Sequence, residues 1–152
     1  MVFPSLIIPP AVVLVTLNAK FIHASLGLRY LLANMGDLRA QTVLREFTIA
    51  REARHIVDDL LATLGSPAAG ERGAGGRQIV GFGVYIWNVA QTTVVVKLIK
   101  AARPDIKIVL GGPEVSHEVD EQEIVRLADH VITGWGDLSF PALCRALLYG
   151  PA

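Results

Sequence analysis

Five short apolar runs alternate along this chain with longer segments of helical spacing, and few folds accommodate such a pattern. Residues 11–17 (AVVLVTL) form a β-branched apolar run, which is typical of a strand buried on both faces. Further runs at residues 42–47, 78–85, 106–110 and 129–133 predict strands, while segments at about 25–35, 49–64, 88–102, 121–127 and 138–148 predict helices. Because parallel strands need crossover connections, this alternation predicts a parallel sheet with helices on its faces.

The predicted fold is an α/β, three-layer, flavodoxin-like (Rossmann-like) domain with a five-stranded parallel sheet. Its length of 152 residues and the number of elements favour the strand order 2-1-3-4-5. Apolar residues make up 52% of the chain and charged residues 18%, which suits strands covered on both faces. We expect a single domain over residues 1–152, with an irregular lead-in at 1–10 and a flexible, glycine-rich insertion at 66–77.

Several residues predict where the helices begin and end. Ser25 can cap the first helix, and Gly36 is expected to end it. Gly65 is expected to end the second helix, and Asn88 to cap the third. Pro104 prevents the third helix from continuing.

Charge and cysteine content exclude several classes of function. Fourteen basic residues balance fourteen acidic ones, so no overall field favours nucleic acid or an anionic membrane. The single Cys144 excludes an internal disulfide and a cysteine-built metal cluster, and its apolar neighbours predict a buried, inert thiol. Prolines interrupt residues 1–11, so no signal peptide or membrane span is expected, and we expect the protein in the cytoplasm.

The predicted ligand site lies where the strands end. Open α/β sheets bind ligands outside the carboxyl ends of their strands, which here places loops 18–27, 86–88, 111–117 and 134–137 around the site. Glycines in these loops allow a bulky ligand to approach the backbone, and aromatic side chains offer apolar walls. The candidate ligand-binding residues are Asn18, His23, Ser25, Gly27, Gly83, Tyr85, Trp87, Asn88, Gly111, Gly112, Pro113, Glu114, Gly134, Trp135 and Asp137.

The sequence offers no catalytic constellation. A phosphotransfer receiver would need acidic residues at the strand ends, where this chain has Asn18 and Tyr85. Neither a GxGxxG dinucleotide motif nor a GxSxG nucleophile turn is present. A metal site built from His23 and His117 with a nearby glutamate stays open as an alternative, but we predict no catalytic residues and no metal ligands.

Three segments, in order, resemble one known family. They are residues 25–31 (SLGLRYL), residues 109–114 (VLGGPE), and residues 128–134 (ADHVITG) with Asp137 beyond them. The sequence resembles the B12-binding domains that precede radical S-adenosylmethionine cores, from about residue 12 to residue 148. In such domains the corrin of cobalamin lies across the loops at the strand ends, and its nucleotide tail enters a slot beside the sheet. The resemblance therefore makes the fifteen residues named above candidate cobalamin contacts, with Gly83, Gly111 and Gly112 leaving room for the tail.

One departure from the family concerns the cobalt ligand. Members that supply their own ligand carry Asp-x-His-x-x-Gly after the first strand, where this chain has Ile22 and Ala24. His23 is offset by one residue, and the family's Ser-x-Leu motif falls on Gly83 and Tyr85. We therefore expect base-off cobalamin without the usual histidine ligand. An alternative reading for Gly111 and Gly112 is that they only make a tight turn before Pro113.

The resemblance also implies a partner domain. A radical core needs a Cys-x-x-x-Cys-x-x-Cys motif, whereas this chain has one cysteine. We therefore expect a downstream radical S-adenosylmethionine domain that carries the iron–sulfur cluster and S-adenosylmethionine, and no turnover by this domain alone. Two alternatives stay open. One is a protein-interaction domain that has lost its cofactor and has a filled cleft; the other is the nucleotide- or nucleotide-sugar-binding half of a two-domain enzyme.

Overall fold

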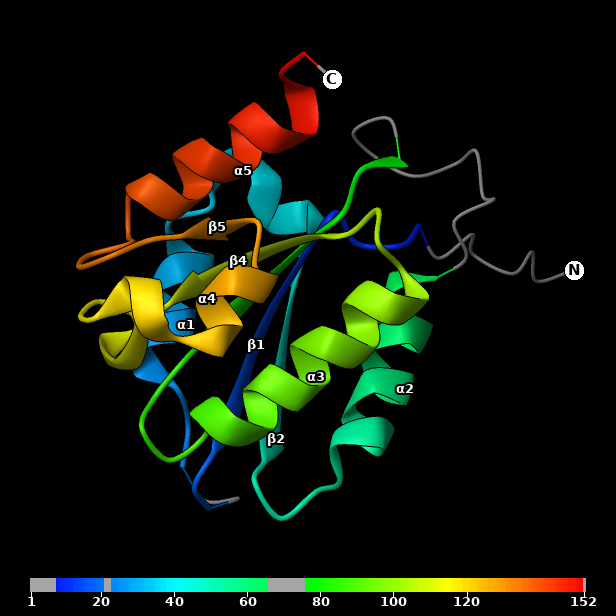
Figure 1. Ribbon diagram of the computed structural model, residues 1–152. Helices are drawn as coiled ribbons and strands as arrows, with labels where there is room; N and C mark the ends of the chain where they lie inside the picture. The colour runs from blue at the N-terminus through cyan, green and yellow to red at the C-terminus, as the bar shows by residue number, and fades with distance from the viewer. Residues whose placement is uncertain (1–7, 21–22, 66–75, 152) are drawn as a thin grey trace, which may run out of the picture.

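The computed structural model describes residues 8–20, 23–65 and 76–151, which form one five-stranded sheet (Figure 1). All the strand pairs are parallel, and the order is β2-β1-β3-β4-β5. The predicted fold class and strand order are therefore confirmed. The strands are β1 (Val12–Asn18), β2 (Thr42–Thr48), β3 (Ile79–Gly83), β4 (Lys107–Gly111) and β5 (His130–Val131).

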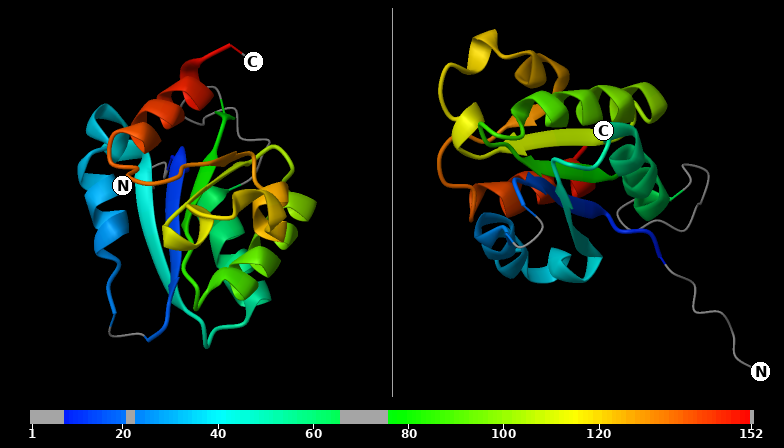
Figure 2. Two further views of the ribbon diagram at one scale, coloured as in Figure 1. Left: turned by 60° about the vertical axis from the view of Figure 1, so that its left-hand side comes forward. Right: turned by 90° about the horizontal axis from the view of Figure 1, so that it is seen from below.

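Helices cover both faces of the sheet, which gives the molecule three layers (Figure 2). On one face lie α2 (Ala53–Leu64) and α3 (Val89–Ala102), with the short α4 (Glu123–Leu127) beside α3. The other face carries α1 (Leu26–Ala33), the 3-10 helix η1 (Gly36–Gln41) and α5 (Ser139–Tyr149). Within the described residues, no helix combines the length and apolar character needed to cross a membrane.

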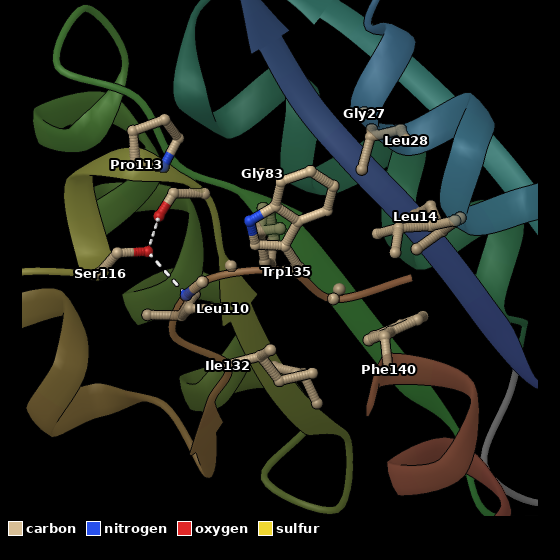
Figure 3. A pocket seen from close by; sticks show the side chains of 18 of the residues that line it. Leu14, Gly27, Leu28, Gly83, Leu110, Pro113, Ser116, Ile132, Trp135 and Phe140 are labelled. Atoms are coloured by element: carbon tan, nitrogen blue, oxygen red, sulfur yellow. Dashed lines mark hydrogen bonds between the residues drawn. The ribbon is translucent and has the colours of Figure 1, made fainter. Parts of the chain in front are cut away.

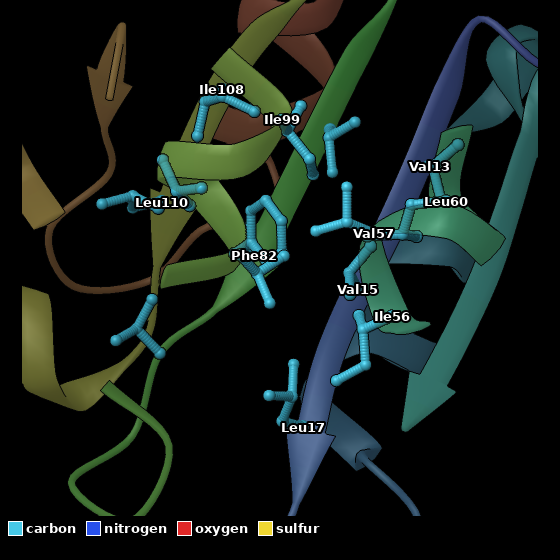
Figure 4. Close-up of a cluster of buried hydrophobic side chains, with 14 of the residues drawn as sticks. Val13, Val15, Leu17, Ile56, Val57, Leu60, Phe82, Ile99, Ile108 and Leu110 are labelled. Carbon is cyan, nitrogen blue, oxygen red and sulfur yellow. The ribbon is translucent and has the colours of Figure 1, made fainter. Parts of the chain in front are cut away.

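The two faces of the sheet are packed differently. Because side chains alternate along a strand, Val13, Val15 and Leu17 point toward α2 and α3, where they are fully buried (Figure 4). Phe82 extends the same core from β3. On the opposite face of β3 the alternate positions are Ile79, Gly81 and Gly83, so only the first of them fills the space under α1 and α5. The glycines leave a groove along that face.

The element boundaries differ from the predictions at several ends. The first helix stops at Ala33, two residues before the predicted end, and Gly36 begins η1 with a φ of +56°. The second helix begins at Ala53 because the amide of Ile49 instead bonds to the Asn18 carbonyl and prolongs the β1–β2 pairing. Strand β5 has only two residues. Most of the predicted insertion and lead-in, residues 66–75 and 1–7, lies outside the described residues.

Cys144 lies in α5 and is fully buried among apolar side chains. Burial raises the pKa of its thiol to about 12, against a smaller opposing effect of Arg145. The thiol is thus protonated at neutral pH, as expected for an unreactive core residue.

Candidate functional site

A slot of about 550 Å³ opens at the carboxyl ends of the strands, on the face covered by α1 and α5 (Figure 3). Its floor is the sheet, which contributes residues of β1, β3 and β4, and its walls are α1, the start of α5 and the loops after β3, β4 and β5. The apolar wall residues that define its shape are Leu14, Leu28, Leu31, Val109, Ile132 and Phe140.

The slot exists because β3 lacks side chains on this face. A Cβ atom at Gly83 would border the slot and make only ordinary contacts, with Thr16 Oγ1 at 3.4 Å and with Tyr85 Cε2 at 3.6 Å. On the next strand, a Cβ atom at Gly111 would have only the Ile132 carbonyl oxygen, 3.9 Å away, within contact range. Deeper in the groove, the Phe140 ring lies over Gly81, where a Cβ atom would be 2.9 Å from Cζ of that ring. The slot therefore opens over Gly83 and Gly111 and closes at Gly81.

Gly112 has a different role from its neighbour Gly111. Its φ of +107° is one that residues with a side chain rarely adopt, and a Cβ atom there would collide with the backbone of Val84. The backbone conformation and the close contact with Val84 are thus enough to explain why residue 112 is a glycine. The tight-turn alternative fits Gly112, whereas Gly111 borders open space.

Polar side chains lie at the mouth of the slot. Ser116 Oγ donates to the Gly112 carbonyl over 2.8 Å and accepts from the Gly134 amide over 3.2 Å, which links the loops after β4 and β5 (Figure 3). The other polar side chains of the lining, Tyr85, His117 and Asp137, also belong to loops beyond the strands. The part of the slot bounded by the strands is apolar.

The loop after β3 is fixed by its aromatic and amide side chains. The Tyr85 and Trp87 rings are stacked with centroids 4.5 Å apart, and Trp87 Nε1 donates to the Leu17 carbonyl over 3.2 Å. Asn88 occupies the N-cap position of α3 but makes no capping bond, contrary to the prediction. Its buried Nδ2 instead donates to the carbonyls of Leu17 and Gly83, so it ties together the ends of β1 and β3.

Trp135 stands at the mouth of the slot and is 91% exposed. It lies between Gly134, with a φ of +74°, and Gly136. The indole is therefore accessible to any ligand that lies across the mouth of the slot.

A second hollow of about 430 Å³ lies at the ends of β1 and β2, with Asn18 and His23 in its lining. Its central group is the Glu46 carboxylate, which accepts from the Ser25 amide at 2.6 Å and from Asn18 Nδ2 at 3.1 Å, and pairs with Arg29 at 2.8 Å. Burial alone would raise the pKa of Glu46, but these hydrogen bonds and the Arg29 charge outweigh it and lower the pKa. Glu46 thus fixes the start of α1.

The predicted site residues fall into three groups. Asn18 and His23 border the second hollow, away from the slot. Ser25 caps α1 through Leu28 N, as predicted, while Trp87 and Asn88 brace their loop and Glu114 accepts from Gln122 through its carbonyl. The remaining nine border the slot: Gly27, Gly83, Tyr85, Gly111, Gly112, Pro113, Gly134, Trp135 and Asp137.

Sequence reasoning missed much of the slot's lining. Gly81 could have been found, because it precedes Gly83 by two residues and must share its face of β3. Phe140 carried no signal, since nothing in its own segment shows how α5 docks on the sheet. The other lining residues that were not among the named candidates are Leu14, Leu28, Leu31, Phe82, Val109, Leu110, Ser116, His117, Ile132 and Gly136. Of these, Ser116, His117 and Gly136 lie in loops that were predicted to surround the site.

The two loop histidines form no shared site. His23 borders the second hollow, whereas His117 lies at the mouth of the slot. Across residues 8–20, 23–65 and 76–151, no group of three His, Cys, Asp or Glu side chains could hold a metal ion.

Comparisons with known proteins agree with this architecture. Among solved structures, the chain is similar to a novel cobalamin-binding protein from Desulfitobacterium hafniense DCB-2, with a TM-score of 0.55 and 21% sequence identity. The match covers 91% of this chain and 58% of that one, so the chain spans less than two thirds of that protein. No curated protein matches the sequence. The family model described as B12 binding domain matches residues 12–144, and the chain therefore belongs to the B12 binding domain family.

Proposed function

We propose that this chain is a cobalamin-binding module that takes the nucleotide tail of the cofactor into the slot and the corrin across its mouth. The observation that carries the proposal is the bare strip of β3, where Gly83 leaves open the space that a side chain would fill. The volume of about 550 Å³ lies within the range of small-molecule sites. Membership in the B12 binding domain family supports the same ligand.

The residues present fit such a ligand. The tail would lie between the glycines of β3 and β4 and the apolar side chains of α1 and α5. The corrin, which is broad and carries amide groups, would meet the loops that hold Tyr85, Pro113 and Trp135. When bound, cobalamin supplies a cobalt centre for methyl-group transfer or for tuning radical chemistry.

We propose that the cofactor is held base-off, with no histidine from this chain on its cobalt. The position of the family's histidine is Ala24, and His23 borders the other hollow. With the nucleotide tail inside the slot, the base at its end would be held away from the corrin and would not bind the cobalt. Electron paramagnetic resonance of the reduced complex should therefore show no nitrogen splitting on the cobalt lines. A nitrogen triplet would contradict this arrangement.

We further propose that the module serves a downstream radical S-adenosylmethionine domain in the cytoplasm. The support is the resemblance of residues 25–31, 109–114 and 128–134 to the B12-binding domains that precede such cores. The coding sequence that follows this domain provides the test. A Cys-x-x-x-Cys-x-x-Cys motif there is expected, and a different downstream domain would overturn the assignment.

The interaction-domain alternative expects side chains to fill the cleft at the strand ends. The slot of about 550 Å³ argues against that alternative and in favour of a ligand. The family match to the B12 binding domain favours cobalamin over a nucleotide sugar.

The substitution Gly83→Leu tests the proposal directly. The new side chain would occupy the slot, while its Cβ atom would make only ordinary contact with Thr16, so the apo fold should keep its melting temperature. After mixing with hydroxocobalamin and desalting, the wild-type protein should keep the corrin absorbance and the variant should lose it. We expect the Kd of the variant to be at least about tenfold higher, which corresponds to a loss of about 1.4 kcal/mol.

The matched control is Val94→Leu, which adds one methylene group at an exposed position of α3 on the opposite layer. It should bind hydroxocobalamin like the wild type. A colourless wild-type protein, or full retention by Gly83→Leu, would refute the proposed function.

A further inference from the structure

We propose that the slot selects its cobamide by the base at the end of the tail, and that it takes a flat base with few polar groups, such as dimethylbenzimidazole, in preference to a purine. Phe140 closes the inner end of the slot and is the residue that sets how deep the base can enter. This inference rests on the proposed function and adds to it a choice among ligands of one class.

The chemistry of the deep part of the slot carries the argument. Its side chains come from Leu14, Val109 and Phe140, none of which offers a hydrogen-bond donor or acceptor. Figure 3 shows Leu14 and Phe140 among them. The backbone of β3 at Gly81 and Gly83 is engaged in the parallel pairings with β1 and β4. A base that enters this far therefore meets no free polar partner among the described residues.

Among the polar side chains of the lining, Tyr85 reaches the outer end of the slot: its Cε2 lies 3.6 Å from the position of a Cβ atom at Gly83, and its hydroxyl lies 3.5 Å from that of a Cβ atom at Gly27. Tyr85, His117 and Asp137 belong to loops beyond the strands, and Ser116 Oγ is already bonded to the Gly112 carbonyl and the Gly134 amide. A purine base carries ring nitrogens, and in adenine an amino group, that would lose their water on entering. A buried polar group left without a partner weakens binding by about tenfold or more, and dimethylbenzimidazole, which leaves one ring nitrogen free when it is off the cobalt, has fewer such groups to desolvate than a purine has.

The Phe140 ring at the inner end of the slot is held in place by the fold. Phe140 is 3% exposed, and its amide donates to the Gly136 carbonyl over 2.9 Å at the start of α5. Its ring lies over Gly81, where a Cβ atom would be 2.9 Å from Cζ and 3.0 Å from Cε2. The ring thus closes the inner end of the slot beside Gly81.

The experiment compares three corrinoids by equilibrium titration of the chain, followed by visible absorbance. Hydroxocobalamin carries dimethylbenzimidazole, the adenine-tailed cobamide carries a purine, and cobinamide has no nucleotide tail. We expect hydroxocobalamin to bind at least about tenfold more tightly than each of the other two. Binding of all three with equal affinity would overturn the selection while leaving corrinoid binding intact. Failure of all three to bind would instead refute the proposed function.

Two variants test the residues themselves. Val109→Thr keeps the shape of the side chain and places a hydroxyl in the deep slot, so the ratio of adenine-tailed to hydroxocobalamin affinity should rise at least threefold. Phe140→Leu removes the aromatic ring that closes the inner end of the slot, so hydroxocobalamin should bind several-fold more weakly while cobinamide binding stays unchanged. Unchanged affinity ratios in both variants would overturn the roles given to these residues.

The matched control is Val80→Thr. Val80 is a buried valine of β3 that faces α2 and α3, away from the slot. The Val80→Thr substitution also buries a hydroxyl, so the stability of this variant should fall about as much as that of Val109→Thr. Its affinity ratio should stay at the wild-type value, and a change equal to that of Val109→Thr would contradict the proposal.

Discussion

At the scale of single residues, the candidate site depends as much on missing side chains as on those present. Gly83 and Gly111 border open space, whereas Gly112 is fixed by its φ of +107° and its contact with Val84. A glycine needed for backbone geometry and one needed for ligand space look the same in a sequence. Only the position of the neighbouring atoms separates them, and here it assigns a different role to each member of the Gly111–Gly112 pair.

Trp135 provides a prediction at this scale. Its 91% exposure means that the indole contributes little to folding, so Trp135→Ala should leave the melting temperature of the apo protein unchanged. Covering an aromatic side chain with a ligand contributes roughly 1.5–3 kcal/mol. The variant should therefore bind hydroxocobalamin about tenfold or more weakly in a titration followed by absorbance.

Tyr149→Ala serves as the control, because this exposed aromatic residue lies at the end of α5. It should bind as the wild type does. Wild-type affinity in Trp135→Ala would show that the bound cofactor does not contact the indole.

At the scale of elements, Glu46 joins the end of β2 to the start of α1. Its carboxylate holds the Ser25 amide, Asn18 Nδ2 and the Arg29 guanidinium, and α1 in turn forms one wall of the slot. Sequence alone gave no sign of this link, because residues 18, 29 and 46 are brought together only by the pairing of β1 with β2.

The substitution Glu46→Gln gives a prediction for pH dependence. The pKa of Glu46 is lowered in the folded state, so its contribution to stability is present above the ordinary pKa of about 4.5 and is lost as the pH falls through the lower folded value. At pH 7 the variant should have a free energy of unfolding about 1–2 kcal/mol below that of the wild type. Urea unfolding measured from pH 7 to pH 3 should show this difference shrinking toward zero.

The pKa of Asp129 is also lowered, although burial opposes this, because Lys100 and the Ile108 amide hold its carboxylate. Acid therefore weakens both proteins, and the informative quantity is the difference between them. A difference that stays constant over the whole pH range would show that the Glu46 charge plays no part.

The order of elements was predictable because it depends on periodicity along the chain. The apolar run at β1 and the alternation with helices predict a parallel sheet, and the structure has one in the predicted order. Element ends were less predictable, since β5 and α2 are limited by tertiary contacts such as the bond from Ile49 N to the Asn18 carbonyl. The walls of the slot were least predictable, because Leu28 and Phe140 reach it only through the docking of α1 and α5.

At the scale of the whole molecule, ligand binding and stability are coupled. A ligand that binds only the folded protein adds about 2.7 kcal/mol at a concentration of 100 times its Kd. For a chain of this size, that addition should raise the melting temperature by roughly 5–10 °C. Calorimetric scans with and without hydroxocobalamin should show this shift for the wild type and a clearly smaller one for Gly83→Leu. An equal shift in both proteins would place the ligand outside the slot.

The unequal packing of the sheet has a consequence for how such a domain can change over time. Valines, leucines and isoleucines fill the core on the side under α2 and α3, whereas the slot that we propose binds the cofactor lies on the glycine-lined side. The sheet separates these two sides. Because side chains alternate along a strand, neighbouring positions face opposite sides of the sheet. Substitutions at positions 83, 109 and 111 should therefore change the slot while the core on the other side of the sheet stays as it is, whereas any side chain at position 81 would collide with the Phe140 ring.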